Sequence, residues 1–420
     1  MRQALLVEKK QMEKNTMSWN LKHLWPAATL SLIGLASAAH AATNRNDSSR
    51  CDPIPGATCY PDDPSCSYCL GPDMVNPAVR PKTCNGDIAL TVAGFYWNSQ
   101  QDGMEFALKD RVAVPTIADN QNANTLIDAE YQNPKDSWDF GFKLGVAYNS
   151  THDGWDFGVD WTWFKTRAKN HVETESDDNQ ILIPLWSAYQ PNAVPVLVAN
   201  DIEASWRLQL NLIDITLGRE FWVSKYMTMR PHIGLRVALI EQDYTIEHKG
   251  GSWNALIPVP ALNNLVKIDN DYKGVGVRSG LDTTWIFGRG WGFYGNFALS
   301  IVYGRFTVEH DETNRHASDL HLKNKVLDTK ESFRASRAMT DLSLGIQWST
   351  LFSDCCYGLT IQLGWEHHMF FHQNQMWRVN RIGGLDQTVN QPNNTGENSF
   401  HQRRGTLDTQ GWTLTVRFEF

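Results

Sequence analysis

The last segment of the chain, 411–420, alternates between apolar and polar side chains. One face carries Trp412, Leu414, Val416, Phe418 and Phe420, and the other carries Thr413, Thr415, Arg417 and Glu419. Such an alternation of period two predicts a β-strand with one apolar face. A strand that ends a chain on an aromatic residue is typical of the closing strand of an outer-membrane barrel, whose apolar face meets lipid. Taken by itself, the segment also fits the last strand of a soluble β-sandwich.

The first 41 residues have the features of an export signal. Basic residues precede a mostly apolar stretch, 25–38, and Ala39-His40-Ala41 then matches a small-x-small cleavage site. The mature chain is therefore predicted to begin at Ala42. Met17 offers a more ordinary start, in which case residues 1–16 are not part of the protein. An uncleaved anchor is the alternative, although the apolar stretch is short for a membrane helix.

Composition agrees with a barrel and excludes one function class. The mature chain of about 380 residues could form several soluble domains or one large barrel. The mean hydropathy of −0.40 is compatible with both, since only alternate barrel residues face lipid. The 17 tryptophans suit aromatic girdles at the two membrane interfaces. A net charge of −8 argues against nucleic-acid binding, which needs a basic face.

Near-alternating runs recur along the interior of the chain. They predict ten strands at about 88–98, 138–149, 154–167, 204–220, 226–246, 272–288, 291–309, 335–351, 356–371 and 405–420. In the run 204–220 the apolar residues change face, and a β-bulge near Leu212 or Ile213 would absorb that slip.

Short and long connections alternate between these runs. Tight turns such as 150–153 and 288–290 lie between polar stretches at 99–137, 168–203, 247–271, 310–334 and 372–404. This predicts an all-β, transmembrane antiparallel β-barrel with short periplasmic turns and long extracellular loops. Apolar pieces within the loops could be further strands, a lumen plug or a subunit contact, so the strand count of about 10 has a range of roughly 8–16.

Four tracts resemble a known family: 86–107, 154–164, 232–244 and, most persuasively, GVGVRSGLDTTWIFGRGWGFYGNFALSIVYGRF at 274–306. They are similar to the major outer membrane proteins of Chlamydiae and Legionella. The resemblance covers roughly 84–420, mostly as pattern, and the long loops show no clear match. It implies an outer-membrane barrel porin, often rich in cysteines that cross-link the envelope, and it offers no catalytic motif.

The seven cysteines fall on the predicted periplasmic side, where thiols oxidise. Cys355 and Cys356 lie in a predicted turn, and a Pro-rich segment before the first strand holds Cys51, Cys59, Cys66, Cys69 and Cys84. The chain is therefore divided into a signal peptide at 1–41, a Cys/Pro-rich periplasmic segment at 42–86 and the barrel at 87–420. All seven are disulfide candidates, and their odd number leaves at least one thiol for another chain. Zinc or redox chemistry at Cys66 and Cys69 is a weaker alternative, because a second ligand pair at suitable spacing is missing.

Charged residues on the predicted inward faces are candidates for a pore lining. Mixed charges fit a wet pore wall, but they fit a salt-bridged plug in a narrow barrel equally well. The set is Asp139, Lys143, Asp156, Asp160, Arg207, Arg236, Arg278, Asp282, Asp341, Glu366 and Arg417. His368 and His372 could also bind a metal, although polar residues at the membrane interface explain them better.

These observations predict an exported, multi-pass outer-membrane porin for passive diffusion of small solutes and ions, with a disulfide cross-linked structural role. Expected partners are outer-membrane lipid, other envelope proteins through disulfides, a second copy of the chain, and the barrel-assembly machinery, which would recognise Phe418 and Phe420. No cofactor, metal or nucleic acid is expected. One alternative is an adhesin or structural anchor with a plugged lumen. The other is an outer-membrane enzyme, for which no nucleophile and base pattern is evident.

Overall fold

The computed structural model divides the chain into two units, Met1–Arg50 and Cys51–Phe420. It describes residue 76 and the ranges 78–83, 87–111, 129–150, 154–174, 180–189, 198–251, 261–316, 322–353, 356–382 and 397–420, all in the second unit. The predicted export signal and Met17 lie outside the described residues, as do Cys51, Cys59, Cys66, Cys69, Cys84 and Cys355. No helix in the described ranges is long and apolar enough to cross a membrane.

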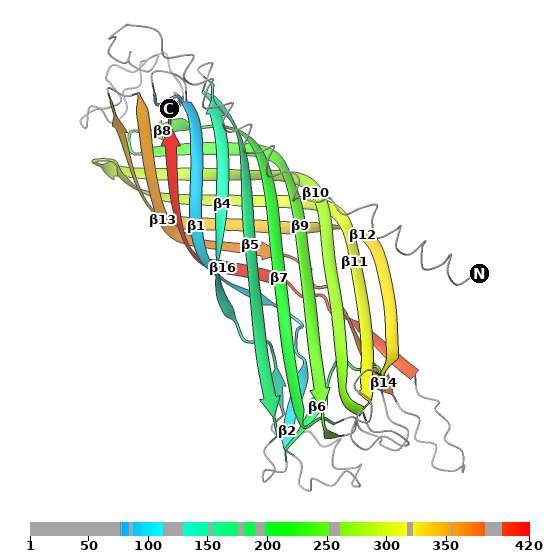
Figure 1. Ribbon diagram of the computed structural model, residues 1–420. Coiled ribbons are helices and arrows are strands. Elements are labelled where there is room, and N and C mark those ends of the chain that lie inside the picture. Colours follow the sequence, from blue (N-terminus) through cyan, green and yellow to red (C-terminus); the bar gives the residue numbers. More distant parts are fainter. Residues whose placement is uncertain are drawn as a thin grey trace, which may run out of the picture. The chain divides into compact units, whose positions relative to one another are not determined.

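In the part of the chain that the structure describes, ten antiparallel strands close into a ring, as the alternating runs predict (Figure 1). The largest sheet has the order β10-β11-β12-β13-β16-β1-β4-β5-β7-β9-β8, and β9 also pairs with β10, so β8 is left outside the ring. The ring strands are β1 (Asp87–Gln101), β4 (Ser137–Asn149), β5 (Trp155–Glu173), β7 (Asp201–Arg219), β9 (Met227–Lys249), β10 (Ala261–Gly288), β11 (Trp291–His316), β12 (Lys323–Phe352), β13 (Tyr357–Phe370) and β16 (Leu407–Glu419). A closed ring leaves no sheet edge in the bilayer, which a membrane-spanning sheet requires.

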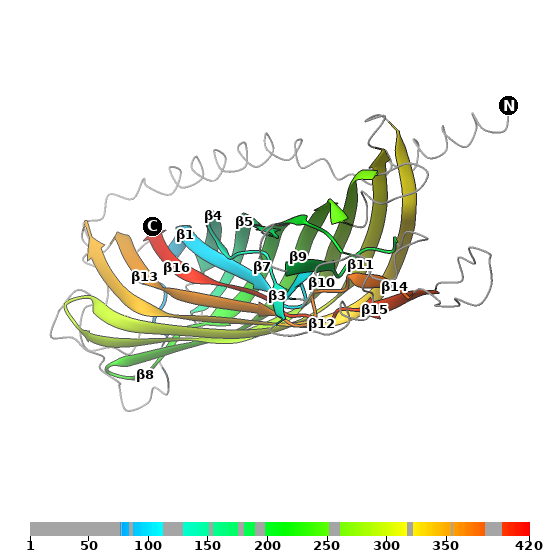
Figure 2. The same ribbon diagram turned by 90° about the horizontal axis from the view of Figure 1, so that it is seen from below.

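Besides the ring, the described residues form six short strands. β8 (Phe221–Ser224) forms a hairpin with β9. A small sheet joins β2 (Ala107–Arg111), β3 (Glu130–Gln132) and β6 (Gln180–Pro184), and β14 (Trp377–Ile382) pairs with β15 (Glu397–Gln402). β14 and β15 lie at the end of the ring opposite to β8 and the C-terminus (Figure 2).

The two ends of the ring differ in their connections. The turns after β4, β8, β10 and β12 are short and lie at the end that holds the C-terminus. In the turn between β10 and β11, Gly288 and Gly290 have φ angles of 115° and 80°, which favour glycine. Short turns mark the periplasmic end of such barrels, so we assign the opposite end, with β2, β6 and β14, to the cell exterior.

The long strands run further toward the exterior than the alternation predicts. β10 begins at Ala261, β11 continues to His316 and β12 begins at Lys323. The predictions of loops at 247–271 and 310–334 are therefore wrong over most of their length. These segments are strands that carry polar side chains on their outward faces.

Apolar side chains change sides along the long strands. In the membrane section, which is the remaining, periplasmic part of the ring strands, outward residues such as Leu235, Val275 and Leu299 are apolar and exposed. In the outer section, defined as 165–173, 201–212, 238–249, 261–273, 305–316 and 323–339, outward residues such as Lys267 and Asp269 are polar and exposed. Many of the inward residues there are apolar and buried, among them Leu208, Ile240, Ile268, Tyr272 and Phe306. The outer section therefore stands in water around an apolar core.

The β-bulge predicted near Leu212 or Ile213 is wrong. β7 pairs with both β5 and β9 without a register shift. Its even-numbered residues face inward throughout, from Ile202 to Gly218. The apolar residues change face because the strand leaves the membrane there, not because the backbone slips.

Candidate functional site in the barrel lumen

A segment before β1 crosses the periplasmic mouth of the ring. The Val79 N–H donates to the carbonyl oxygen of Glu220 at 3.0 Å, and Ala78 forms a bridge with Phe221. Arg80 Nε donates to Glu220 Oε2 at 2.8 Å, and Arg80 Nη1 donates to Glu419 at the end of β16. The Arg80 side chain is only 8% exposed. A buried arginine with two carboxylate partners thus joins this crossing segment to opposite parts of the wall.

A second set of ion pairs crosses the middle of the lumen. Arg236 on β9 donates to both carboxylate oxygens of Asp214 on β7, each at 2.7 Å. It also lies 2.8 Å from Asp341 Oδ2 on β12, two strands beyond its own neighbour β10. Arg278 on β10 contacts Asp341 as well. The Arg236 side chain is 2% exposed, so its partners and neighbours enclose it almost completely within the lumen.

The network continues to the other wall through His368. Its Nδ1 lies 2.7 Å from Asp341 Oδ1, and its Nε2 lies 3.4 Å from Glu366 Oε2. Lys143 on β4 then donates to the same Glu366 oxygen at 2.6 Å. Hydrogen bonds and ion pairs therefore connect β4, β13, β12, β9 and β7 in one layer. We call Lys143, Asp214, Arg236, Arg278, Asp341, Glu366 and His368 the lumen network.

Nearer the periplasm, Arg230 pairs with Asp156 across β7 and with Asp282 on the neighbouring strand at 2.8 Å. Asp160 faces the same space, since its carboxylate interacts electrostatically with Arg230. Unlike its neighbours, the Asp160 side chain is exposed. Side chains therefore leave part of the lumen between Arg80 and the lumen network unfilled.

At the outer end, two segments fold into the ring and complete the apolar core. Residues 104–111 and 180–189, here called the insert, contain β2 and β6 and place Phe106, Leu182 and Trp186 against the inward faces of the long strands. Tyr244 Oη donates to the Met104 carbonyl at 2.7 Å, and Trp186 Nε1 donates to the Glu105 carbonyl at 2.6 Å.

Glu312 on β11 anchors the insert. Its carboxylate accepts hydrogen bonds from Ser187 Oγ at 2.5 Å, from the Ala188 N–H at 2.7 Å and from Asn264 Nδ2 at 2.7 Å. Burial in this part of the outer section raises the pKa of Glu312, and the hydrogen bonds from Ser187 and Asn264 oppose that rise. Loss of the carboxylate would leave several buried donors without an acceptor.

The structure places most of the predicted lumen residues on inward faces. Asp139, Lys143, Asp156, Asp160, Arg236, Arg278, Asp282, Asp341, Glu366 and Arg417 all point inward. Asp139 accepts from Thr166 Oγ1 at 2.6 Å, and Arg417 lies 2.9 Å from Glu419.

The prediction for Arg207 is wrong. This side chain is 52% exposed on the outward face and pairs with Asp243 at 3.0 Å. It lies in the outer section, where polar residues face outward. The sequence reasoning also missed Arg80 and Arg230. Arg80 lies in an irregular Pro-rich segment without periodicity, whereas Arg230 shares the even-numbered inward face of β9 with Arg236 and could have been found.

The terminal aromatic residues lie where the ring closes. Phe420 and Ile88 exchange two backbone hydrogen bonds, at 2.8 and 3.0 Å. The Phe418 ring lies 5.9 Å from that of Phe420 and 5.8 Å from that of Tyr357. Cys356 is partly buried in the periplasmic turn before β13.

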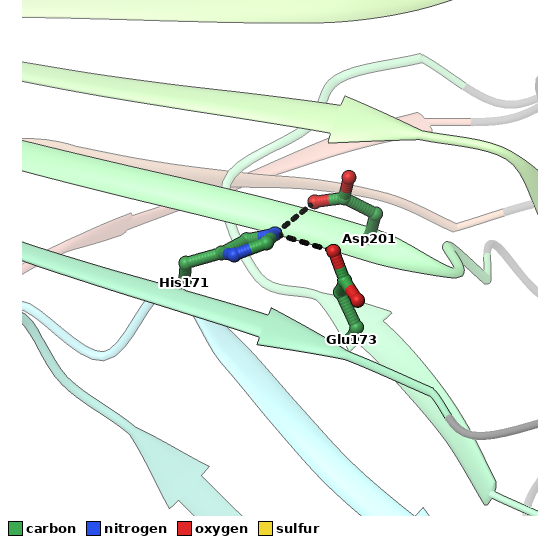
Figure 3. A group of neighbouring side chains, drawn as sticks. All are labelled: His171, Glu173 and Asp201. Carbon is green, nitrogen blue, oxygen red and sulfur yellow. Dashed lines mark hydrogen bonds and ion pairs between the residues drawn. The ribbon is translucent and has the colours of Figure 1, made fainter.

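Among the described residues, one group outside the lumen could hold a metal ion. His171 Nε2 lies 3.2 Å from Glu173 Oε1 and 2.9 Å from Asp201 Oδ1, at the exterior ends of β5 and β7 (Figure 3). One imidazole and two carboxylates suit a divalent transition metal. Half of the His171 side chain is exposed, and Lys249 also reaches Asp201 at 3.9 Å, so these contacts equally suit surface ion pairs. His368 and His372 do not form the site considered from the sequence, because His368 bonds within the lumen network while His372 is exposed.

Comparison with known proteins identifies one family and several solved structures of low similarity. The family model described as Legionella pneumophila major outer membrane protein precursor matches residues 85–420. A search of curated proteins finds no match. Among solved structures, the outer membrane protease OmpT from Escherichia coli has 9% identity and a TM-score of 0.33, with 80% of this chain and 96% of that chain covered. A Pseudomonas aeruginosa FadL homologue has 10% identity and a TM-score of 0.23, with 87% and 95% covered.

Proposed function

This chain belongs to the Legionella pneumophila major outer membrane protein family, and from that premise we propose that it is a surface-exposed structural protein of the outer membrane whose barrel is closed. The proposal selects the plugged-lumen alternative over a general diffusion porin. Only the activity of the barrel is proposed. The outer-membrane location follows from the family and from the closed ring of strands.

Buried side chains at three levels of the lumen are the observation that carries this proposal. Arg80 at the mouth, Arg236 in the lumen network and Trp186 in the insert are all buried, and they lie at successive levels of the ring. Barrels of about eight strands are just wide enough for side chains to fill, whereas aqueous porins use about 16–18 strands. A ring of ten strands with these layers is therefore expected to hinder passage of solutes.

Planar-bilayer recording tests the proposal. We expect the refolded full-length chain to insert without stepwise ion currents, because no water-filled path would run between the two ends. A refolded general porin, recorded under the same conditions, controls for insertion and detection. Regular current steps from the wild-type chain would contradict the closed barrel.

A disulfide-linked structural role is the second part of the proposal. Cys356 lies at the periplasmic end, and the segment 78–83, which follows most of the cysteines in sequence, crosses the mouth at that same end. These positions support the view that the cysteines work in the oxidising periplasm, where bonds to neighbouring envelope proteins can form.

A gated porin is the second candidate function. The exposed Asp160 favours it, because side chains do not fill the whole lumen. Closure at the exterior end also depends on the insert rather than on the wall alone. In this view, movement of the insert together with rearrangement of the lumen network would open a path lined by charges of both signs.

The variant Glu312→Ala tests the gated porin. Without this carboxylate the insert loses the hydrogen bonds from Ser187 and Ala188, and Asn264 on β10 loses a third, so a gated barrel should show current steps that the wild type lacks. Glu309→Ala is the matched control, since Glu309 lies on the same strand but pairs outside the lumen with Lys330. A silent Glu312→Ala variant with a displaced insert, detected by proteolysis near 185–189, would contradict gating at this position.

A further inference from the structure

Three cations lie side by side on the outward face where the outer section begins. Lys273 on β10 is directly opposite Arg305 on β11, and Arg305 is directly opposite Arg334 on β12. All three side chains are exposed. We call these three residues the basic row.

The basic row is poorly neutralised by the protein itself. Lys273 reaches Glu241 at 3.6 Å. Among the described residues, Arg305 and Arg334 have no carboxylate partner. Like charges that face each other across paired strands destabilise a sheet, so the pair Arg305 and Arg334 favours an anion that can bind both.

The surroundings of the basic row limit where such an anion would lie. Asp271 is two residues from Lys273 on the same strand, so the β10 end of the row also faces negative charge. On β12, the outward neighbours of Arg334 are Ser332 and Ser336, which are uncharged and exposed. The favourable position is therefore between Arg305 and Arg334.

The depth of the row in the membrane indicates the source of the anion. Toward the periplasm, the next outward residues are Val275 and Tyr303, both exposed, and Ile301 follows. The row is thus continuous with the apolar face that meets lipid tails, and Tyr303 suits the aromatic belt at an interface. In the orientation assigned above, the row lies at the headgroup level of the outer leaflet.

We propose that the basic row binds a phosphorylated headgroup of an outer-leaflet glycolipid. The planar guanidinium group forms paired hydrogen bonds with phosphate oxygens, and two facing arginines can hold one phosphate from both sides. The aliphatic chains of the same lipid would pack against Ile301 and its neighbours. This site is independent of whether the barrel conducts.

Binding to mixed micelles tests the proposal. Fluorescently labelled full-length protein in dodecyl maltoside would be titrated with micelles containing diphosphorylated lipid A, and binding followed by microscale thermophoresis. The double variant Arg305→Gln, Arg334→Gln should bind at least about tenfold more weakly, because charge-assisted hydrogen bonds are lost. The control Lys323→Gln, Lys330→Gln removes the same charge from β12 farther from the lipid-facing surface and should bind as the wild type does.

Two further arms identify the source of the phosphate. Lipid A without phosphates should bind the wild type as weakly as lipid A binds the double variant. Inorganic phosphate alone should compete poorly, since it lacks the chains that contact Ile301. Equal binding of lipid A by wild type and double variant, with both folded by circular dichroism, would overturn the proposal, and strong competition by inorganic phosphate would overturn the choice of a lipid.

Discussion

Two arginines on neighbouring strands show how position along a strand decides what a charge does. Arg236 on β9 is buried in the lumen network, whereas Arg207 on β7 is half exposed and pairs with Asp243 in water. The alternation of apolar and polar residues around each arginine predicts that both side chains line the lumen. The difference arises because Arg207 lies beyond the membrane section, where the inward face is apolar.

Replacement of Arg236 should be far more damaging than replacement of Arg207. Arg236→Met leaves Asp214 and Asp341 without this partner in a buried layer, which should cost about 3–5 kcal/mol of unfolding free energy. Arg207→Gln removes an exposed pair and should cost about 0–1 kcal/mol. Denaturant unfolding in detergent, followed by gel mobility of the folded form, measures both. Similar losses for the two variants would contradict the assigned faces.

A pair of carboxylates on the outward face of the outer section should make stability depend on pH. Asp243 and Asp269 lie directly opposite each other, and partial burial together with the Asp243 charge raises the pKa of Asp269 to about 6. Because the pKa of Asp269 is higher in the folded than in the unfolded state, the folded state binds the proton of this carboxyl more tightly. This proton binding stabilises the fold at pH values below the unfolded pKa, and the stabilisation is lost as the pH rises through about 6.

Asp269→Asn should therefore raise the thermal unfolding midpoint relative to wild type at pH 7.5, and this gain should shrink toward zero near pH 4. Asp328→Asn is the control, because its exposed carboxylate pairs with Lys325 rather than with another acid. A gain for Asp269→Asn that is equal at both pH values would contradict the role of the carboxylate pair.

At the level of elements, the sequence was sufficient to predict the ten ring strands but not the change of environment along them. The alternation in β5, β11 and β16 marks strands because one face is apolar at every position of the membrane section. The same rule failed at 261–271 and 323–334, where outward polar residues resemble loops. It also misread β7, because a reversal of apolar faces and a bulge give the same sequence pattern.

The lumen could be predicted only in part for a related reason. Inward charge follows from the alternation, as for Asp341 and Glu366. Which charges meet across the ring depends on the strand order and on tilt, so the partnership of Arg236 with Asp341 could not be deduced. Arg80 lies in no strand, and the insert comes from stretches read as extracellular loops.

Two substitutions by arginine on the outward face of β11 test the boundary between the membrane section and the outer section. Leu299→Arg places a charge against lipid and should cost about 2–4 kcal/mol of unfolding free energy if it lies near the membrane midplane. Thr307→Arg, eight positions along the same face in the outer section, should change it by less than about 0.5 kcal/mol. Folding yield into lipid vesicles of fixed thickness measures the difference, and an equal penalty at both positions would contradict the boundary.

At the scale of the whole molecule, the odd number of cysteines predicts bonds between chains. In intact envelopes, non-reducing gels should show high-mass species that collapse to the monomer on reduction, since at least one of the seven thiols lacks an internal partner. Replacement of Cys355 and Cys356 together should reduce these species without loss of the barrel, which its closed strand ladder holds. Envelope protein that runs wholly as monomer without reductant would contradict cross-linking.

The reversal of apolar faces also predicts how temperature acts on the molecule. In the outer section, side chains such as Ile240 and Phe306 leave water when the chain folds, so unfolding of this section carries the large positive heat capacity of apolar hydration. In the membrane section, residues such as Leu299 face lipid in the folded barrel, and their contribution follows the bilayer instead. Cooling therefore weakens the outer core while it leaves the ladder of hydrogen bonds in the membrane intact. The end of the protein that faces the surroundings of the cell should have a temperature of greatest stability of its own, separate from that of the ring that anchors it.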